Sequence, residues 1–181
     1  MSEVEFNGEE FGKILKIAKL FCDNGKSENP PNFVIFMGGV GVGKTTTRKQ
    51  YFADGYVQFD FGEIYKEIKK EFGKDNPRLS QYATVASNMI LQESLNAKKN
   101  IIIEIIGDKK EIFDPIIDKM IAIGYEFSVR LVTCDPKKAY KRHLIAAKED
   151  KDYFSAYFTQ EPTLSFFYQQ FGLGEIPKMT P

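Results

Sequence analysis

The sequence is poor in the side chains that build zinc centres. Its 181 residues include two cysteines, Cys22 and Cys134, and one histidine, His143. One histidine and two cysteines are a weak basis for a zinc site, so we expect none. We predict that both cysteines are free, buried thiols in a reducing compartment, and that the histidine is a packing residue without a functional role.

The sequence also has no excess of charge of either sign and no long apolar run. Lysine and arginine together number 25, as do aspartate and glutamate. This balance gives no electrostatic reason to expect non-specific binding to nucleic acid or to an anionic membrane. No apolar run reaches the ~18 residues of a membrane span, and the acidic residues 1–5 are unlike the start of a signal peptide. We expect a cytoplasmic protein with no nucleic-acid or membrane partner.

An amphipathic helix is predicted near the N-terminus, over residues 8–22. Asn7 and Glu10 have the spacing of a capping box at its start. The stretch 23–31 that follows has the composition of a linker. The helix is therefore expected to be an appendage that packs on the main domain. Its apolar stripe would be formed by Phe11, Ile14, Leu15, Ala18, Phe21 and Cys22.

Beyond this helix, apolar runs alternate with helical patterns. The first run has the continuous apolar character of a strand that is buried on both faces. The alternation favours an α/β fold with an open parallel sheet covered by helices on both faces. Strands are predicted at 33–37, 56–60, 101–106 and 127–133, and helices at 44–52, 62–72, 80–97, 115–123 and 136–148.

Helix ends are marked by familiar residues. Asp114 before Pro115, and Asp135 before Pro136, are typical of an N-cap followed by a first-turn proline. Gly124 is typical of the residue just past a helix end. The length favours a single domain, 1–181. We divide it into the N-terminal helix and linker (1–31), a nucleotide-binding core (32–150) and aromatic-rich C-terminal helices (151–181).

A complete phosphate-binding loop motif, G-x-x-x-x-G-K-[S/T], follows the first strand and precedes a helix. Its N–H groups and the positive end of the helix favour phosphate. Lys44, solvated when no ligand is bound, should reach the β- and γ-phosphates, and the Thr45 hydroxyl should bind Mg²⁺. This predicts a P-loop NTPase fold that binds ATP or GTP with Mg²⁺. The residues expected to hold the nucleotide are Gly38, Gly39, Val40, Gly41, Val42, Gly43, Lys44, Thr45 and Thr46.

Asp60 ends the second predicted strand. Ligands of open parallel sheets bind beyond the carboxyl ends of the strands. There a carboxylate could accept a hydroxyl proton or hold a magnesium-bound water. The alternative is that Asp60 caps the next helix, with Glu63 as its capping partner or as a solvated charge.

Glu104 is the one acid in a run of six residues that are otherwise all isoleucine. Burying a lone carboxylate is costly unless it is paired or binds a metal. We therefore predict that Glu104 lies near the loop and assists magnesium or the substrate. The alternatives are a charge on an edge strand, or Asp108 in the same role.

The last predicted core helix carries a cluster of cations. Among them Arg142 is the best candidate to stabilise transferred charge, because a guanidinium suits phosphate oxygens. The alternative is a solvated basic face. The aromatic residues beyond 151 are expected to be mostly core, with some that could stack on a base or line a partner surface.

The order of these features resembles that of the zeta-toxin-like small P-loop kinases. The resemblance implies ATP- or GTP-dependent phosphorylation of a small hydroxyl-bearing molecule, which in zeta toxins is a UDP-activated amino sugar. It implies that Asp60 corresponds to the family's base and Glu104 to a substrate-contacting glutamate. It also implies an antitoxin-like protein partner. The matching segments are 38–45, 82–90, 100–104 and Gly124-Tyr125 leading into the strand 127–133, together with Asp60.

Three functions remain open from the sequence. The first is a kinase, in which Lys44 holds the donor, Asp60 works on the acceptor, Glu104 assists and Arg142 stabilises charge. The second is an NTP-dependent switch or ATPase that acts through a protein partner. The third is a nucleotide-binding module without catalysis. A kinase needs an acceptor site beside Asp60, which the other two do not.

Overall fold

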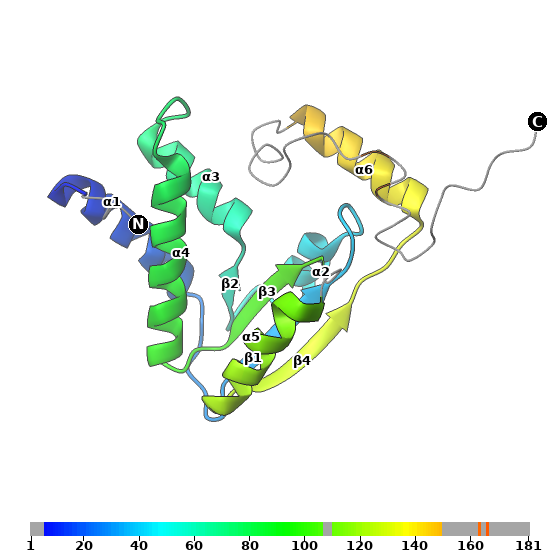
Figure 1. Ribbon diagram of the computed structural model, residues 1–181, viewed down its shortest axis with the longest axis horizontal. Helices are drawn as coiled ribbons and strands as arrows, with labels where there is room; N and C mark the ends of the chain where they lie inside the picture. Colours follow the sequence, from blue (N-terminus) through cyan, green and yellow to red (C-terminus); the bar gives the residue numbers. More distant parts are fainter. Residues whose placement is uncertain (1–5, 107–109, 150–162, 164–165, 167–181) are drawn as a thin grey trace, which may run out of the picture. The chain divides into compact units, whose positions relative to one another are not determined.

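The structure, a computed structural model, describes residues 6–106, 110–149, 163 and 166 (Figure 1). Asp108 and almost all of the segment 151–181 lie outside these residues, so the predictions made for them stay predictions. In chain order the elements are α1 (Gly8–Cys22), β1 (Asn32–Met37), α2 (Lys44–Tyr51), β2 (Val57–Phe59), α3 (Phe61–Phe72), α4 (Leu79–Asn96), β3 (Ile101–Ile105), α5 (Lys110–Ala122), β4 (Glu126–Leu131) and α6 (Pro136–Glu149).

The described strands form one sheet, in the order β2-β3-β1-β4. β1 and β4 run parallel, in a register that pairs Asn32 with Glu126 and Met37 with Leu131. Phe33–Phe36 in β1 is buried at every position, as predicted for a strand covered on both faces. The α/β fold with a parallel sheet is confirmed, and each strand ends within two residues of its predicted bounds.

The chain divides into two compact units, each built from two separate stretches. Unit 1 comprises Met1–Pro31 and Asp54–Ile101, and unit 2 comprises Asn32–Ala53 and Ile102–Pro181. Within unit 2, α2 contacts β1 and α5 contacts β4. In Figure 1, α5 passes in front of these strands and α2 lies behind the end of β3. The single domain over 1–181 stays a prediction.

Unit 1 is a helical layer in which α1 packs on α3 and α4 and contacts β2. The predicted capping box is present: Glu10 N donates to Asn7 Oδ1 at 2.8 Å, and Asn7 N donates to Glu10 Oε2 at 3.0 Å. The predicted apolar stripe is wrong at Phe11, which is 46% exposed, and it omits Ile17, which is buried. Ile17 lies one helical turn after the fully buried Ile14, so the packed face runs through these two positions.

The start of α5 differs from the sequence prediction. The helix begins at Lys110, so Asp114 is not its cap and Pro115 lies inside it. A proline within a helix removes one backbone hydrogen bond, and α5 forms with this loss and contacts β4. The other end was predicted correctly: Gly124 has φ +88° just beyond the helix. Asp135 caps α6 as predicted, with its Oδ1 accepting from Lys138 N at 3.0 Å.

Both cysteines are free thiols. Cys22 is fully buried, and burial raises the pKa of its thiol, an effect partly offset by the hydrogen-bonding contact with Ser94. Cys134 was also predicted to be buried, but it is partly exposed because it follows the end of β4. His143 is 1% exposed and lies in the packed interior of unit 2. No helix in the described part of the chain is long and apolar enough to span a membrane.

Candidate active site

The phosphate-loop motif forms the turn between β1 and α2 in unit 2. Gly38 and Gly41 have φ of +152° and +72°. If they carried Cβ atoms, these would lie 2.2 Å from the Val132 carbonyl oxygen and 2.4 Å from the Ala139 carbonyl oxygen. Both are backbone atoms, which cannot rotate away. Only glycine therefore lets the loop lie this close to the end of β4 and the first turns of α6.

The two valines of the loop fasten it to α6. Val42 is 4% exposed and packs with the fully buried Ala139. Val40 packs against the same pair, as do Val132, Cys134, Tyr140 and Phe166. Both valine side chains lie in this apolar cluster. If these two residues bind nucleotide, as predicted, they do so through their backbone groups.

Lys44, the first residue of α2, turns back onto the loop. Its ammonium donates to the carbonyl oxygens of Gly38 at 2.6 Å and Gly39 at 2.9 Å. The expectation of a solvated lysine is therefore wrong, because the turn of the loop brings two carbonyl oxygens within reach. These bonds hold the cation at the place where the motif requires it.

Glu104, from β3, lies against α2. Its Oε2 accepts a hydrogen bond from Thr45 Oγ1 at 2.9 Å, and its Oε1 pairs with Arg48 Nε at 2.5 Å. The Arg48 side chain is 1% exposed and the Glu104 side chain 11%. Because β3 lies between β2 and β1, the alternative of a charge on an edge strand is wrong.

Arg48 was missed by the sequence analysis. It follows Thr45 by three residues, so the two side chains share one face of α2. An acid in an isoleucine strand needs a cation as its partner, and the helix after the loop was the nearest element to search for one. The need of Glu104 for a cation and the position of this helix could together have identified Arg48.

Arg142 approaches the loop from α6. Its Nη1 donates to the carbonyl oxygens of Val42 at 3.3 Å and Gly41 at 3.5 Å. It follows Ala139 by three residues, so it lies on the face of α6 that packs on the loop. Unit 2 thus brings Arg142 together with Lys44 and the pair of Thr45 and Glu104. Thr46, which follows Thr45 in α2 and was also predicted to bind the nucleotide, is exposed.

Asp60 belongs to unit 1, where it is the N-cap of α3. Its Oδ1 accepts hydrogen bonds from Gly62 N at 2.9 Å and from Glu63 N at 3.3 Å. The capping role considered as the alternative is thus present. Its role toward an acceptor stays a prediction.

The oxygen atoms beside the loop suit magnesium. Among the residues that the structure describes, no three His, Cys, Asp or Glu side chains gather into a cage for a metal. Magnesium needs no such cage, because it is usually held by one or two protein oxygens together with substrate phosphates and water. The Thr45 hydroxyl, with the Glu104 carboxylate 2.9 Å away, is a donor set of this kind.

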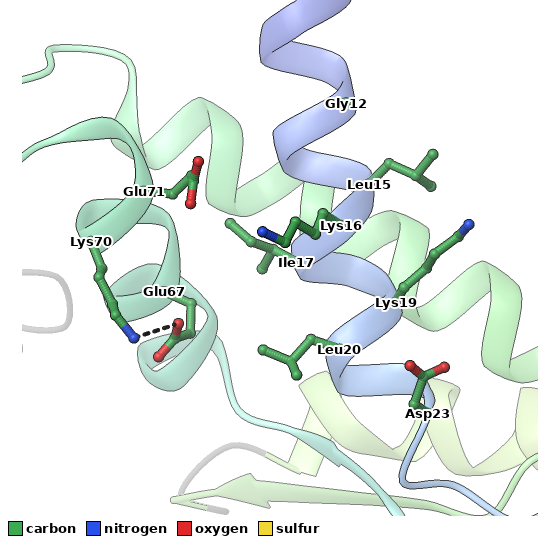
Figure 2. Close-up of a pocket in the computed structure, with 10 residues that line it drawn as sticks. All are labelled: Gly12, Leu15, Lys16, Ile17, Lys19, Leu20, Asp23, Glu67, Lys70 and Glu71. Carbon is green, nitrogen blue, oxygen red and sulfur yellow. Dashed lines mark ion pairs between the residues drawn. The ribbon is translucent and has the colours of Figure 1, made fainter.

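A surface hollow of about 620 Å³ lies elsewhere, between α1 and α3 in unit 1 (Figure 2). Leu15 and Leu20 line it from α1, and the ion pair of Lys70 with Glu67 lines it from α3, with Nζ and Oε2 3.5 Å apart. None of the predicted site residues lines this hollow.

Two solved structures have a similar fold. One belongs to the PezAT chromosomal toxin-antitoxin system of Streptococcus pneumoniae, with a TM-score of 0.63 and 17% identity over 95% of this chain and 76% of that chain. The other is the crystal structure of AvrRxo1-ORF1:AvrRxo1-ORF2 with sulphate ions, with a TM-score of 0.53 and 14% identity over 90% of this chain and 52% of that one. At such low identity the likeness shows the fold alone. No curated protein matches the sequence.

The sequence itself matches the family model of the zeta toxins over residues 18–153. That range covers more than half of the chain and includes the loop, Glu104 and Arg142. The chain therefore belongs to the zeta toxin family, with the kinase-like P-loop fold of that family.

Proposed function

We propose that this protein is a kinase that uses ATP, or GTP, and Mg²⁺ to phosphorylate a small hydroxyl-bearing molecule. Nucleotides and nucleotide sugars are the acceptor class to test first, since zeta toxins act on a UDP-activated amino sugar. The observation that carries the proposal is the contact of the Thr45 hydroxyl with the Glu104 carboxylate at 2.9 Å. In P-loop enzymes, such a hydroxyl and an acid from a neighbouring strand serve the metal of the nucleotide.

The donor phosphates would bind to backbone N–H groups of the loop and to the positive end of α2. Lys44 would neutralise the β- and γ-phosphates, since its ammonium is already held in the loop by the Gly38 and Gly39 carbonyl oxygens. Exchange of these neutral acceptors for charged phosphate oxygens is favourable, because the ammonium and the phosphate carry opposite charges that attract each other.

Thr45 would hold Mg²⁺ directly, and Glu104 would support it through the Thr45 hydroxyl or a bound water. When bound, the ion neutralises and orients the phosphate oxygens. Negative charge on the transferred group would be stabilised by Arg142, whose guanidinium lies 3.3 Å from the Val42 carbonyl oxygen in the loop. Asp60 follows the carboxyl end of β2, and we assign it to the acceptor hydroxyl.

The proposal is tested by incubation with γ-labelled ATP or GTP, Mg²⁺ and a panel of nucleotides and UDP-amino sugars. Labelled product that depends on Mg²⁺ and disappears in Lys44→Ala is the expected result. Hydrolysis of the nucleotide without transfer would instead indicate a switch or an ATPase. Binding without any turnover would indicate a nucleotide-binding module.

Asp60→Asn separates the two roles of Asp60. Asparagine is as good an N-cap as aspartate but cannot take a proton. We expect nucleotide affinity and stability close to wild type, with transfer reduced by about 10²–10⁴, the usual contribution of a positioned general base. Transfer at the wild-type rate would reduce Asp60 to a helix cap.

We also propose an antitoxin-like protein partner, in keeping with the toxin-antitoxin system to which one of the similar structures belongs. Expression in bacteria should then slow growth, and Lys44→Ala should relieve the effect because it removes phosphate neutralisation without removing the fold. Equal growth of cells that express the two forms at equal levels would argue against a toxic activity.

A further inference from the structure

Helix α2 buries an arginine where a helix usually buries apolar side chains. Its eight residues, KTTTRKQY, include one buried residue, Arg48, whose side chain is 1% exposed. Taking a guanidinium out of water is costly unless its charge is paired in good geometry. The reason for an arginine at this position therefore lies in its partner.

The partner is a carboxylate that α2 holds by both of its oxygens. Arg48 Nε lies 2.5 Å from Glu104 Oε1, and Thr45 Oγ1 lies 2.9 Å from Glu104 Oε2. Arg48 and Thr45 are three residues apart on the same helix, so they form one face toward β3. Rotation of the Glu104 carboxylate away from α2 would break both bonds together.

The direction of the Thr45 hydrogen bond matters for a cation. A threonine hydroxyl has one proton and two lone pairs. Here the proton is donated to Glu104, so the lone pairs of Oγ1 face away from the carboxylate. A hydroxyl oriented in this way can give an oxygen lone pair to magnesium.

We infer that Arg48 is a positioning residue, which holds Glu104 against Thr45 and thereby keeps this carboxylate beside the metal-binding hydroxyl. The inference rests on the proposed function, because it takes the Mg²⁺ of the nucleotide as the ligand. It adds a metal-side role to the substrate contact that the family resemblance implies for this glutamate. Each oxygen of Glu104 accepts one bond from α2 and keeps a second lone pair, so both bonds are compatible with contact with an acceptor.

The test measures the Mg²⁺ dependence of nucleotide binding and needs no acceptor. A fluorescent ATP analogue is titrated with Mg²⁺ in the presence of the wild type, Arg48→Gln and Lys49→Gln. Loss of an outer partner of a metal ligand typically costs about 10–100-fold, so the Mg²⁺ concentration for half-saturation should rise by that factor when Glu104 is released from Thr45, as Arg48→Gln is expected to do. Nucleotide binding in EDTA should be unchanged. Lys49→Gln removes the same charge from an exposed position of the same helix and should behave as wild type.

Three further variants separate the proposed role of Arg48 from a simple loss of folding. Arg48→Lys keeps the charge and should give a smaller rise in half-saturation. Glu104→Gln should raise it as much as Arg48→Gln does, and the double variant no further, because Arg48 acts through Glu104. A purely structural arginine would lower the melting temperature in both backgrounds without moving the half-saturation. That result, or an unchanged half-saturation in Glu104→Gln, would overturn the inference.

Failure of the inference and failure of the kinase proposal give different results. Absence of transfer to any acceptor contradicts the kinase assignment alone, because the titration depends only on nucleotide and metal. An Arg48→Gln protein that transfers phosphate and keeps the wild-type Mg²⁺ dependence contradicts the role of Arg48 alone.

Discussion

Replacement of Gly41 by alanine tests how the phosphate loop is held in place. Gly41 has φ +72°, and an added Cβ would lie 2.4 Å from the Ala139 carbonyl oxygen and 3.1 Å from the carbonyl carbon. These atoms belong to the backbone of α6, so the helix itself must move to make room. Arg142 lies on the same face of α6, and the movement would take its guanidinium away from the Val42 carbonyl oxygen.

The loss in the free energy of unfolding has two parts, backbone strain and overpacking, and a matched control variant separates them. Gly124 has φ +88°, but an added Cβ there would meet no atom within 4 Å. Gly124→Ala therefore measures backbone strain alone, about 1–2 kcal/mol. Gly41→Ala adds overpacking, which typically costs about 1–3 kcal/mol, so we expect about 2–5 kcal/mol in total.

The difference in melting temperature between the two variants is measured by thermal unfolding, with circular dichroism as the signal. In a protein of this length, 1 kcal/mol shifts the midpoint by about 2–4 °C, so Gly41→Ala should melt roughly 2–12 °C below Gly124→Ala. Mg-ATP affinity should fall in Gly41→Ala and stay unchanged in Gly124→Ala. A Gly41→Ala protein as stable as Gly124→Ala would refute the close approach of α6 to the loop.

Three other predictions concern side chains described above. Lys44→Ala removes the two hydrogen bonds from the ammonium to the loop, so the ligand-free protein should melt lower, by about 2–4 °C for each kcal/mol lost. It should also lose the stabilisation by Mg-ATP, about 2.7 kcal/mol at a hundredfold excess over Kd in the wild type; an unaltered ligand-induced shift would contradict its role. The hydrogen bond from Tyr82 lowers the pKa of Glu10. The carboxylate therefore adds stability above its unfolded pKa of about 4.3, and this stability is lost as the pH falls through the lower folded value. Glu10→Gln should flatten the acid side of a pH–stability curve, and an unchanged acid side would argue against the bond. Cys134 should react with a thiol reagent well before the buried Cys22, and equal rates in the native protein would show that α1 is not packed as described.

Much of the fold could be predicted because local patterns dictate it. The continuous apolar run of β1 and the capping box of Asn7 with Glu10 each require only neighbouring residues. The start of α5 was predicted wrongly, because an aspartate followed by a proline is typical of a helix start, whereas Asp114 and Pro115 lie inside this helix. The exposed Phe11 was misplaced for a related reason: periodicity gives an apolar face but not which of its residues meet α3 and α4.

The candidate site divides in the same way. The phosphate-binding turn could be predicted because its sequence motif is local. Glu104 could be predicted because it is a single acid in a run of isoleucines. Arg48 was hidden because an arginine in a polar helix looks solvated until its partner in another element is known. The sequence pattern does not decide the role of Asp60. Its carboxylate lies both at the end of a strand and at the start of a helix, so it fits a catalytic base as well as a helix cap.

The interleaving of the two units sets an order for folding during synthesis. Chains emerge N-terminal end first, at about 5–20 residues per second. Helix α1 therefore leaves the ribosome well before α4, against which it packs, and the phosphate loop leaves well before α6. The apolar cluster of Val42 with Ala139 can close only when α6 has been made. A nascent chain carries the whole loop motif throughout the synthesis of the segment between α2 and α6 before that loop has its final shape, so nucleotide binding would begin only after α6 has been made.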